Sequence, residues 1–241
     1  MKVSEIYNYL NELSPFEIQE SWDNSGILLE NNGFCERIYL SLDLDYQQVK
    51  QFKNNSLIIT HHPLIFKGLK NIKNDYVGNI LKELIIKNCA LISMHTNYDL
   101  SHLNKYFVEK ILEKEIIKND NFLLYFKNDF SNIYELCDYL KSKLNLKNIT
   151  ISLAKNMKNS ELIGVCTGSG ISLASNLNSN IFLTGDIKYH DALMLSENDI
   201  SVIDIRHYES EICFANSLYD NLQKLPIDII MCHSKNPFLD Y

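Results

Sequence analysis

Arginine is almost absent from this sequence of 241 residues: Arg37 and Arg206 are the only two among 23 basic residues. The formal net charge is −7, and the lysines form no basic stripe. Proteins that bind nucleic acids neutralise phosphates with such stripes. We therefore expect no nucleic acid as the main partner, and a protein that binds a nucleic-acid strand would need a local patch of lysines instead.

Long apolar runs and paired cysteines are also missing. All apolar runs are far shorter than the roughly 20 residues of a membrane helix, and the first residues lack the apolar core of a signal peptide. The six cysteines stand singly, without a C-x-x-C pair, mostly inside apolar runs where a free thiol behaves as a small hydrophobe. These absences predict a soluble, cytoplasmic protein with no membrane segment, and the apolar share of 46% is enough for a sizeable core.

Strands and helices alternate along the chain, which predicts an α/β fold. Apolar runs predict strands at 27–30, 37–44, 56–60, 89–94, 122–126, 149–153, 162–166, 180–184, 200–205 and 227–232. Helical spacing marks residues 6–13 (with Ser4 as the expected N-cap), 77–85, 133–144 and 187–195, and a further helix after Ser101. The pattern restarts after the polar stretch 118–121. We predict a first α/β lobe of residues 1–117, joined by the C-terminal segment 206–241, and a second α/β lobe of residues 118–205.

Histidines and acids follow three of the predicted strands. In open α/β sheets, ligands collect outside the carboxyl ends of the strands. Imidazole and carboxylate together suit zinc, iron, manganese or nickel, and a two-metal site activates water for hydrolysis. The sequence therefore predicts a two-metal site, with candidates His61, His62, His95, Asp99 and, on one helix face at i, i+4 spacing, His207 and Glu211.

Each candidate also has an ordinary interpretation. A pair of adjacent histidines alone is typical of a surface loop, and His207 with Glu211 is typical of a charged pair on an exposed helix. Asp99 suits the N-cap of the helix expected after Ser101, although Ser101 suits that role equally. His95 fits a metal ligand, a supporting group or a general acid. The coincidence of three strand ends favours the metal.

Three other segments stand out. Residues 22–26 carry the only tryptophan and are interpreted as a turn with a packed aromatic side chain. After the strand 180–184, His190 fits equally a pocket wall, as proton donor or substrate contact, and a structural role, while Asp186 fits a helix cap. Residues 168–170, Gly-Ser-Gly, are typical of a turn, with anion binding at a helix start as the weaker alternative.

With these motifs in this order, the chain resembles the NIF-three-like family, the GTP cyclohydrolase 1 type 2 homologs. The features that carry the resemblance are segments 21–26, 60–63, 95–99, 184–190 and 207–211. The resemblance implies a two-lobed α/β protomer with a dinuclear metal site in the cleft between the lobes. It also implies assembly as a toroidal homohexamer.

Two divalent metal ions per chain are implied by the same resemblance, their identity open among zinc, iron, manganese and nickel. His95 and His190 would line the pocket as catalytic groups. The implied ligands are His61 and His207 for one metal, His62 and Asp99 for the other, and Glu211 as the bridge.

The activity that the resemblance implies is metal-dependent hydrolysis of a nucleotide-like small molecule, with the imidazole ring of GTP opened and formate released. The alternative is a non-catalytic metal-binding or metal-trafficking ring protein. One departure concerns Arg206, which precedes His207 where the family usually has a small residue, often glycine. Arg206 either points away from the site or adds a cation at its mouth. In the second case it suits a phosphate-bearing substrate, and Arg206→Ala weakens substrate affinity.

Overall fold

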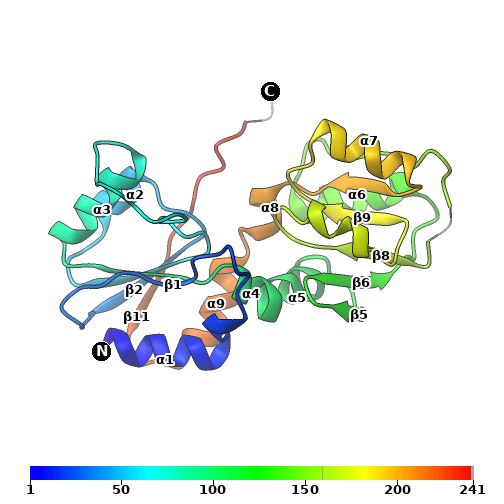
Figure 1. The fold of residues 1–241 in the computed structure, drawn as a ribbon. Helices are drawn as coiled ribbons and strands as arrows, with labels where there is room; N and C mark the ends of the chain where they lie inside the picture. The colour runs from blue at the N-terminus through cyan, green and yellow to red at the C-terminus, as the bar shows by residue number, and fades with distance from the viewer. Residues whose placement is uncertain (159, 240–241) are drawn as a thin grey trace. The chain divides into compact units, whose positions relative to one another are not determined.

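The structure, a computed structural model, describes residues 1–158 and 160–239. The chain divides into two compact units: the first comprises Met1–Ser101 and Phe214–Lys235, and the second His102–Cys213 and the residues from Asn236 onward. Each unit is a sheet with helices packed against it (Figure 1). The predicted α/β class with two lobes is therefore confirmed.

The first unit is built on a mixed sheet with the strand order β1-β4-β3-β2-β11. The strands β4, β3, β2 and β11 run parallel to one another, and β1 is antiparallel to β4. The central strand β3 is buried at every residue, as expected for a strand covered on both faces. The bounds are β1 Gly26–Leu29, β2 Arg37–Ser41, β3 Ser56–Thr60, β4 Ala90–Ser93 and β11 Asp228–Met231.

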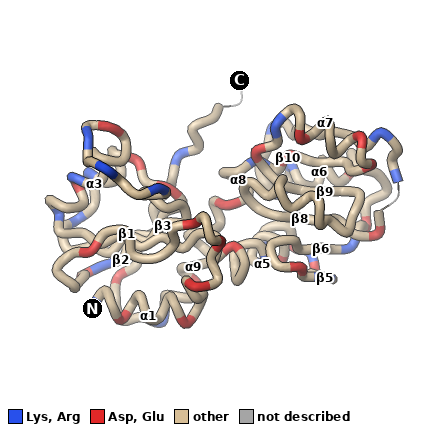
Figure 2. Tube along the Cα trace, viewed as in Figure 1, with Lys and Arg blue, Asp and Glu red and all other residues tan. Residues whose placement is uncertain are grey.

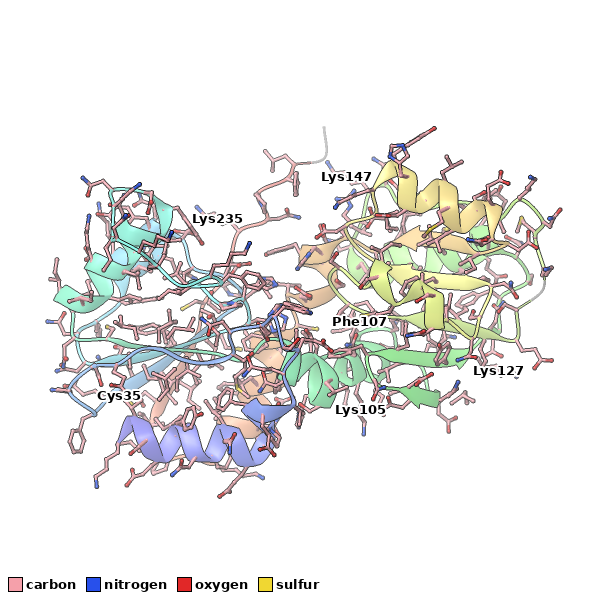
Figure 3. The ribbon with its side chains drawn as sticks, viewed as in Figure 1. Cys35, Lys105, Phe107, Lys127, Lys147 and Lys235 are labelled. Carbon is pink, nitrogen blue, oxygen red and sulfur yellow. The ribbon has the colours of Figure 1, made fainter. Side chains whose placement is uncertain are left out.

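Helices cover both faces of this sheet, with α1 and α9 on one face and α2 and α3 on the other (Figure 1). Helix α1 begins earlier than expected, because its N-cap is Lys2 and not the predicted Ser4. The backbone N–H of Lys2 donates to the Glu5 carboxylate at 3.1 Å. Cys35 is buried next to the N-terminal amino group, which donates to its carbonyl oxygen at 2.9 Å (Figure 3). The bounds are α1 Val3–Leu13, η1 Phe16–Ile18, α2 Tyr46–Gln51, α3 Tyr76–Ile86 and α9 Phe214–Leu222.

The helical segment after β4 begins before Ser101, at Thr96. Asp99 already has helical backbone angles, φ −55° and ψ −50°, and its N–H donates to the carbonyl of His95 at 2.9 Å. Neither Asp99 nor Ser101 caps this helix, so that interpretation is wrong for both. The consecutive turns are α4 Thr96–Tyr98, the π-helical η2 Asp99–Leu103, α5 Asn104–Tyr106 and the π-helical η3 Phe107–Ile111.

The second unit is built on a mixed sheet with the strand order β5-β6-β8-β9-β10-β7. The strands β8, β9 and β10 are parallel, and the outer pairings are antiparallel. The bounds are β5 Ile116–Asp120, β6 Leu123–Lys127, β7 Thr150–Ser152, β8 Leu162–Val165, β9 Ile181–Thr184 and β10 Ser201–Asp204.

The polar stretch 118–121 lies in β5 and in the turn to β6, inside the second unit. Because β5 is an exposed edge strand, its polar composition reflects contact with solvent. Phe107, by contrast, is fully buried in this unit (Figure 3). The helical elements are α6 Ile133–Leu144, η4 Ile171–Asn176, α7 Tyr189–Glu197 and α8 His207–Glu211.

Lysines and acids are interspersed along both units (Figure 2). Among the residues that the structure describes, no helix is long and apolar enough to cross a membrane.

Candidate metal centre

The parallel pairing of β3 with β4 carries three histidines to one edge of the first sheet. Thr60 pairs with Ser93, so the two strands end side by side, and the Met94 N–H donates to the Thr60 carbonyl at 2.9 Å. His61 and His62 follow directly on β3, while His95 follows Met94. The strand register therefore fixes where all three imidazoles emerge.

The three imidazoles form a cluster. One ring nitrogen each of His61, His62 and His95 lies within 4.8 Å of the others. The His61 ring is 4.8 Å from that of His62 and 5.1 Å from that of His95, between centroids. His61 is fully buried and the other two are partly exposed. Converging imidazoles of this kind suit a borderline divalent cation.

Each ring of this cluster is held through its Nδ1 atom. The partner is the Met94 carbonyl for His61 (2.9 Å) and the Asp43 carboxylate for His62 (2.9 Å). Carbonyl and carboxylate oxygens accept hydrogen bonds, so Nδ1 is the donor in both rings, and in a neutral imidazole this arrangement places the lone pair on Nε2. Metal-binding histidines are oriented in this way, by a second hydrogen bond to a carboxylate or a carbonyl.

The third ring is anchored by Asp23, a residue that sequence reasoning placed only in a turn. The Asp23 carboxylate is 2.8 Å from Nδ1 of His95 and also accepts hydrogen bonds from the N–H and hydroxyl of Thr96. Burial opposes ionisation of Asp23, but the hydrogen bonds with His95 and Thr96 outweigh it and hold the pKa of this carboxyl well below its usual range. Asp23 is therefore a fixed negative charge behind His95.

Asp99 adds a carboxylate to the histidine cluster. Its Oδ1 lies 3.4 Å from Nε2 of His61, and its side chain is only 14% exposed. It sits one helical turn after His95, which explains why residues four apart in the sequence belong to one site.

The second unit contains its own pair of candidate ligands on α8. Nε2 of His207 lies 2.9 Å from Oε2 of Glu211, so the expected i, i+4 pair is present. Nδ1 of His207 donates to Asp186 at 2.6 Å. Asp186 therefore orients an imidazole, and its interpretation as a helix cap is wrong: α7 has its N-cap position at Lys188.

Gly168 allows the turn of residues 168–170 to lie close to His207 and Glu211. It has a φ of +60°, and a Cβ there would overlap with the Glu211 carboxylate. Its N–H donates to the Ser210 hydroxyl at 3.0 Å, while the Gly170 N–H donates to the Thr184 hydroxyl at 2.8 Å. Both amides are thus used within the protein, which favours the turn over the anion-binding alternative.

Two other residues singled out in the sequence, His190 and Trp22, are exposed. His190 is exposed in the first turn of α7, with its ring against Tyr189, and it belongs to none of the candidate metal groups among residues 1–158 and 160–239. Trp22 lies in the expected turn, but its side chain is packed on one side only, against other rings, and is 56% exposed.

Arg206 occupies strained backbone, with φ +61° and ψ 153°. Only glycine adopts this region readily, and other residues there cost about 1–3 kcal/mol. The Arg206 guanidinium contacts the Asn148 carbonyl at 3.2 Å and Glu209 at 3.7 Å. The position before His207 therefore favours glycine for a backbone reason.

We expect Arg206→Gly to stabilise the protein by about 1 kcal/mol, since relief of strain exceeds the lost ion pair and the greater freedom of unfolded glycine. In thermal denaturation the midpoint should rise by about 2–4 °C. Arg206→Ala keeps the strain and loses the guanidinium contacts, so its midpoint should fall. A lower midpoint for Arg206→Gly would contradict the strain.

We expect Asp43→Asn to weaken binding of zinc or manganese by about 10–100-fold, because the amide fixes the His62 ring less well than the carboxylate. Competition with a chromophoric chelator measures this affinity. Asp129→Asn is the matched control, because Asp129 has similar exposure but pairs with Lys127 in the second unit. Equal affinities for the two variants would argue against a metal at His62.

These observations define an α/β protein of two mixed sheets with a histidine and carboxylate cluster suited to binding metal. The model of the family Duf34/NIF3 (NGG1p interacting factor 3) matches residues 1–237, and the chain belongs to this family. The resemblance inferred from the motifs is confirmed.

Relatives match over nearly their whole length. The "GTP cyclohydrolase 1 type 2 homolog" of Campylobacter jejuni is 52% identical over 240 residues, covering 99% of both chains. The "GTP cyclohydrolase 1 type 2" of Helicobacter pylori is 41% identical, covering 98% of this chain and 97% of its own. A hypothetical protein of Staphylococcus aureus has a similar structure, with a TM-score of 0.86, 26% identity, and coverage of 100% of this chain and 99% of that one.

Proposed function

We propose that the protein is a metal-dependent hydrolase that uses two divalent cations per chain and acts on a nucleotide-like substrate, with GTP as the first candidate. The observation that carries this proposal is the cluster of His61, His62 and His95, whose Nδ1 atoms are all anchored. The similarity to proteins named GTP cyclohydrolase 1 type 2 supports the choice of substrate.

The donor set fits such cations. It consists of imidazoles whose Nδ1 atoms are anchored and of carboxylates that are only 14% (Asp99) and 4% (Glu211) exposed, and such donors suit zinc, iron, manganese or nickel. When bound, the cations would lower the pKa of a bound water and stabilise negative charge on the substrate. The proposed ligands are His61, His62 and Asp99 of the first unit and His207 and Glu211 of the second.

Proton transfer is the proposed role of His95. Asp23 holds the His95 ring in one orientation through Nδ1, so Nε2 is the ring atom left to exchange a proton with a departing nitrogen. His190 is proposed as a second proton-transfer or substrate-contact group.

Turnover of GTP by metal-loaded protein tests the proposal, with formate release and loss of purine absorbance as readouts. Glu211→Ala protein and a chelator-treated sample serve as controls, and both should be inactive. Two bound metals without turnover of GTP would contradict the cyclohydrolase and favour the metal-binding or metal-trafficking alternative.

We also propose that the chain assembles as a toroidal homohexamer and acts in the cytoplasm. Membership of the family supports the assembly, and six cysteines that form no disulfide with one another support a reducing compartment. Sedimentation equilibrium should give the mass of six chains; the mass of a single chain would contradict the ring.

A further inference from the structure

Two aromatic side chains remain exposed beside the histidine cluster of the first unit. Trp22 is 56% and Phe66 43% exposed. Their rings are in contact, with centroids 5.9 Å apart and planes at 45°. Trp22 also lies edge-on to the ring of His95 at 6.1 Å. Aromatic rings that lie against a histidine of the cluster, yet are largely open to solvent, offer a stacking surface for a ligand ring.

This surface is held in place by hydrogen bonds. The Asn24 side-chain amide donates to the Ile65 carbonyl, which ties the segment of Trp22 to that of Phe66. The Ser25 hydroxyl donates to Asp23 at 2.9 Å, and Asp23 in turn holds His95. The segments that carry the two rings are therefore tied to each other and to His95, and a surface built on ordered backbone costs less to order on binding.

The segment that carries Phe66 is positively charged within an acidic protein. Residues 63–74 contain Lys67, Lys70 and Lys73 and no acid, whereas the whole chain has a formal net charge of −7. All three lysines are exposed. This local charge favours a ligand with an anionic group over a neutral aromatic one.

We propose that Trp22 and Phe66 form a subsite that stacks the planar heteroaromatic ring of the substrate, while Lys67 and Lys70 attract its anionic group. The ligand class is a purine nucleotide. This inference deepens the proposed function and rests on it for the reaction, but the stacking itself is independent of turnover. It assigns specificity to aromatic side chains beside His95 that bind no metal.

Tryptophan fluorescence tests the subsite directly, because Trp22 is the only tryptophan. The metal-loaded full chain is titrated with GTP and, separately, with inorganic triphosphate. GTP should quench the emission saturably, whereas triphosphate should compete with GTP without quenching. Since stacking on an aromatic side chain is worth about 5- to 150-fold in affinity, Phe66→Ala should weaken GTP binding by that factor, measured by calorimetry, and leave triphosphate binding unchanged.

Two variants control this experiment. Phe66→Tyr keeps an aromatic ring and should bind GTP with the affinity of the unchanged protein. Phe34→Ala removes an aromatic side chain of the first unit that is 55% exposed and should leave the affinity unchanged.

The outcomes separate the subsite from the hydrolase. Unchanged GTP affinity of Phe66→Ala, with metals bound and turnover intact, would overturn the subsite alone. Unchanged affinity together with an altered sedimentation mass would assign the aromatic pair to contact with a second copy, and would also overturn it. Quenching that depends on Phe66, in a protein that turns over no GTP, would support the subsite and overturn only the hydrolase.

Discussion

Replacing Gly168 with alanine should remove metal from the protein as effectively as Glu211→Ala. The new Cβ would overlap with the Glu211 carboxylate and force it away from the position it shares with His207. The φ of +60° adds strain of about 1–3 kcal/mol. We expect the metal content, measured by plasma mass spectrometry after dialysis, to fall from two ions per chain to one or fewer.

Gly33→Ala separates the overlap from the strain. Gly33 also has a positive φ, +90°, but a Cβ there would meet no atom within 4 Å. This variant should lose a similar amount of stability and keep both metals. Full metal content in Gly168→Ala would show that Glu211 is not a ligand, or that its carboxylate adapts at no cost.

Replacing His61 with alanine should have the largest effect on the histidine cluster. His61 is fully buried, with its ring next to those of His62 and His95, and its Nε2 lies 3.4 Å from Asp99. Loss of a ligand should weaken metal binding by more than the about 10–100-fold that a supporting residue contributes. Calorimetric titration with zinc measures the affinity, and turnover of GTP should become undetectable.

The exposed His233 provides the control for this variant, because His233→Ala also removes an imidazole from the first unit. The His233→Ala variant should bind zinc with the affinity of the unchanged protein. If His61→Ala kept native affinity and turnover, the histidine cluster would not be the metal centre.

Much of the fold could be predicted because the decisive patterns are local. The apolar run 56–60 predicts β3 at its observed bounds, and helical spacing predicts α3 and α6. The spacing of His207 and Glu211 likewise predicts their contact, because four residues make one helical turn. Such signals need no knowledge of tertiary contacts.

The groups that orient the histidines could not be predicted in the same way. Asp43 and His62 are 19 residues apart in the sequence, and Asp23 and His95 are 72 apart, so only the folded sheet brings each pair together. The earlier start of the helix at Thr96 was missed for a related reason. Asp99 and Ser101 are good capping residues, but Asp99 lies inside the helix, where its carboxylate contacts His61.

Anomalous diffraction from crystals grown with zinc tests the metal centre most directly. We expect two anomalous peaks per chain, with ring nitrogens of the histidine cluster about 2.0–2.1 Å from the nearest zinc ion. His207 and Glu211 should also contact zinc in the same map. If crystals that bind zinc elsewhere showed no anomalous peak near His61 and His62, these histidines would not form a metal centre.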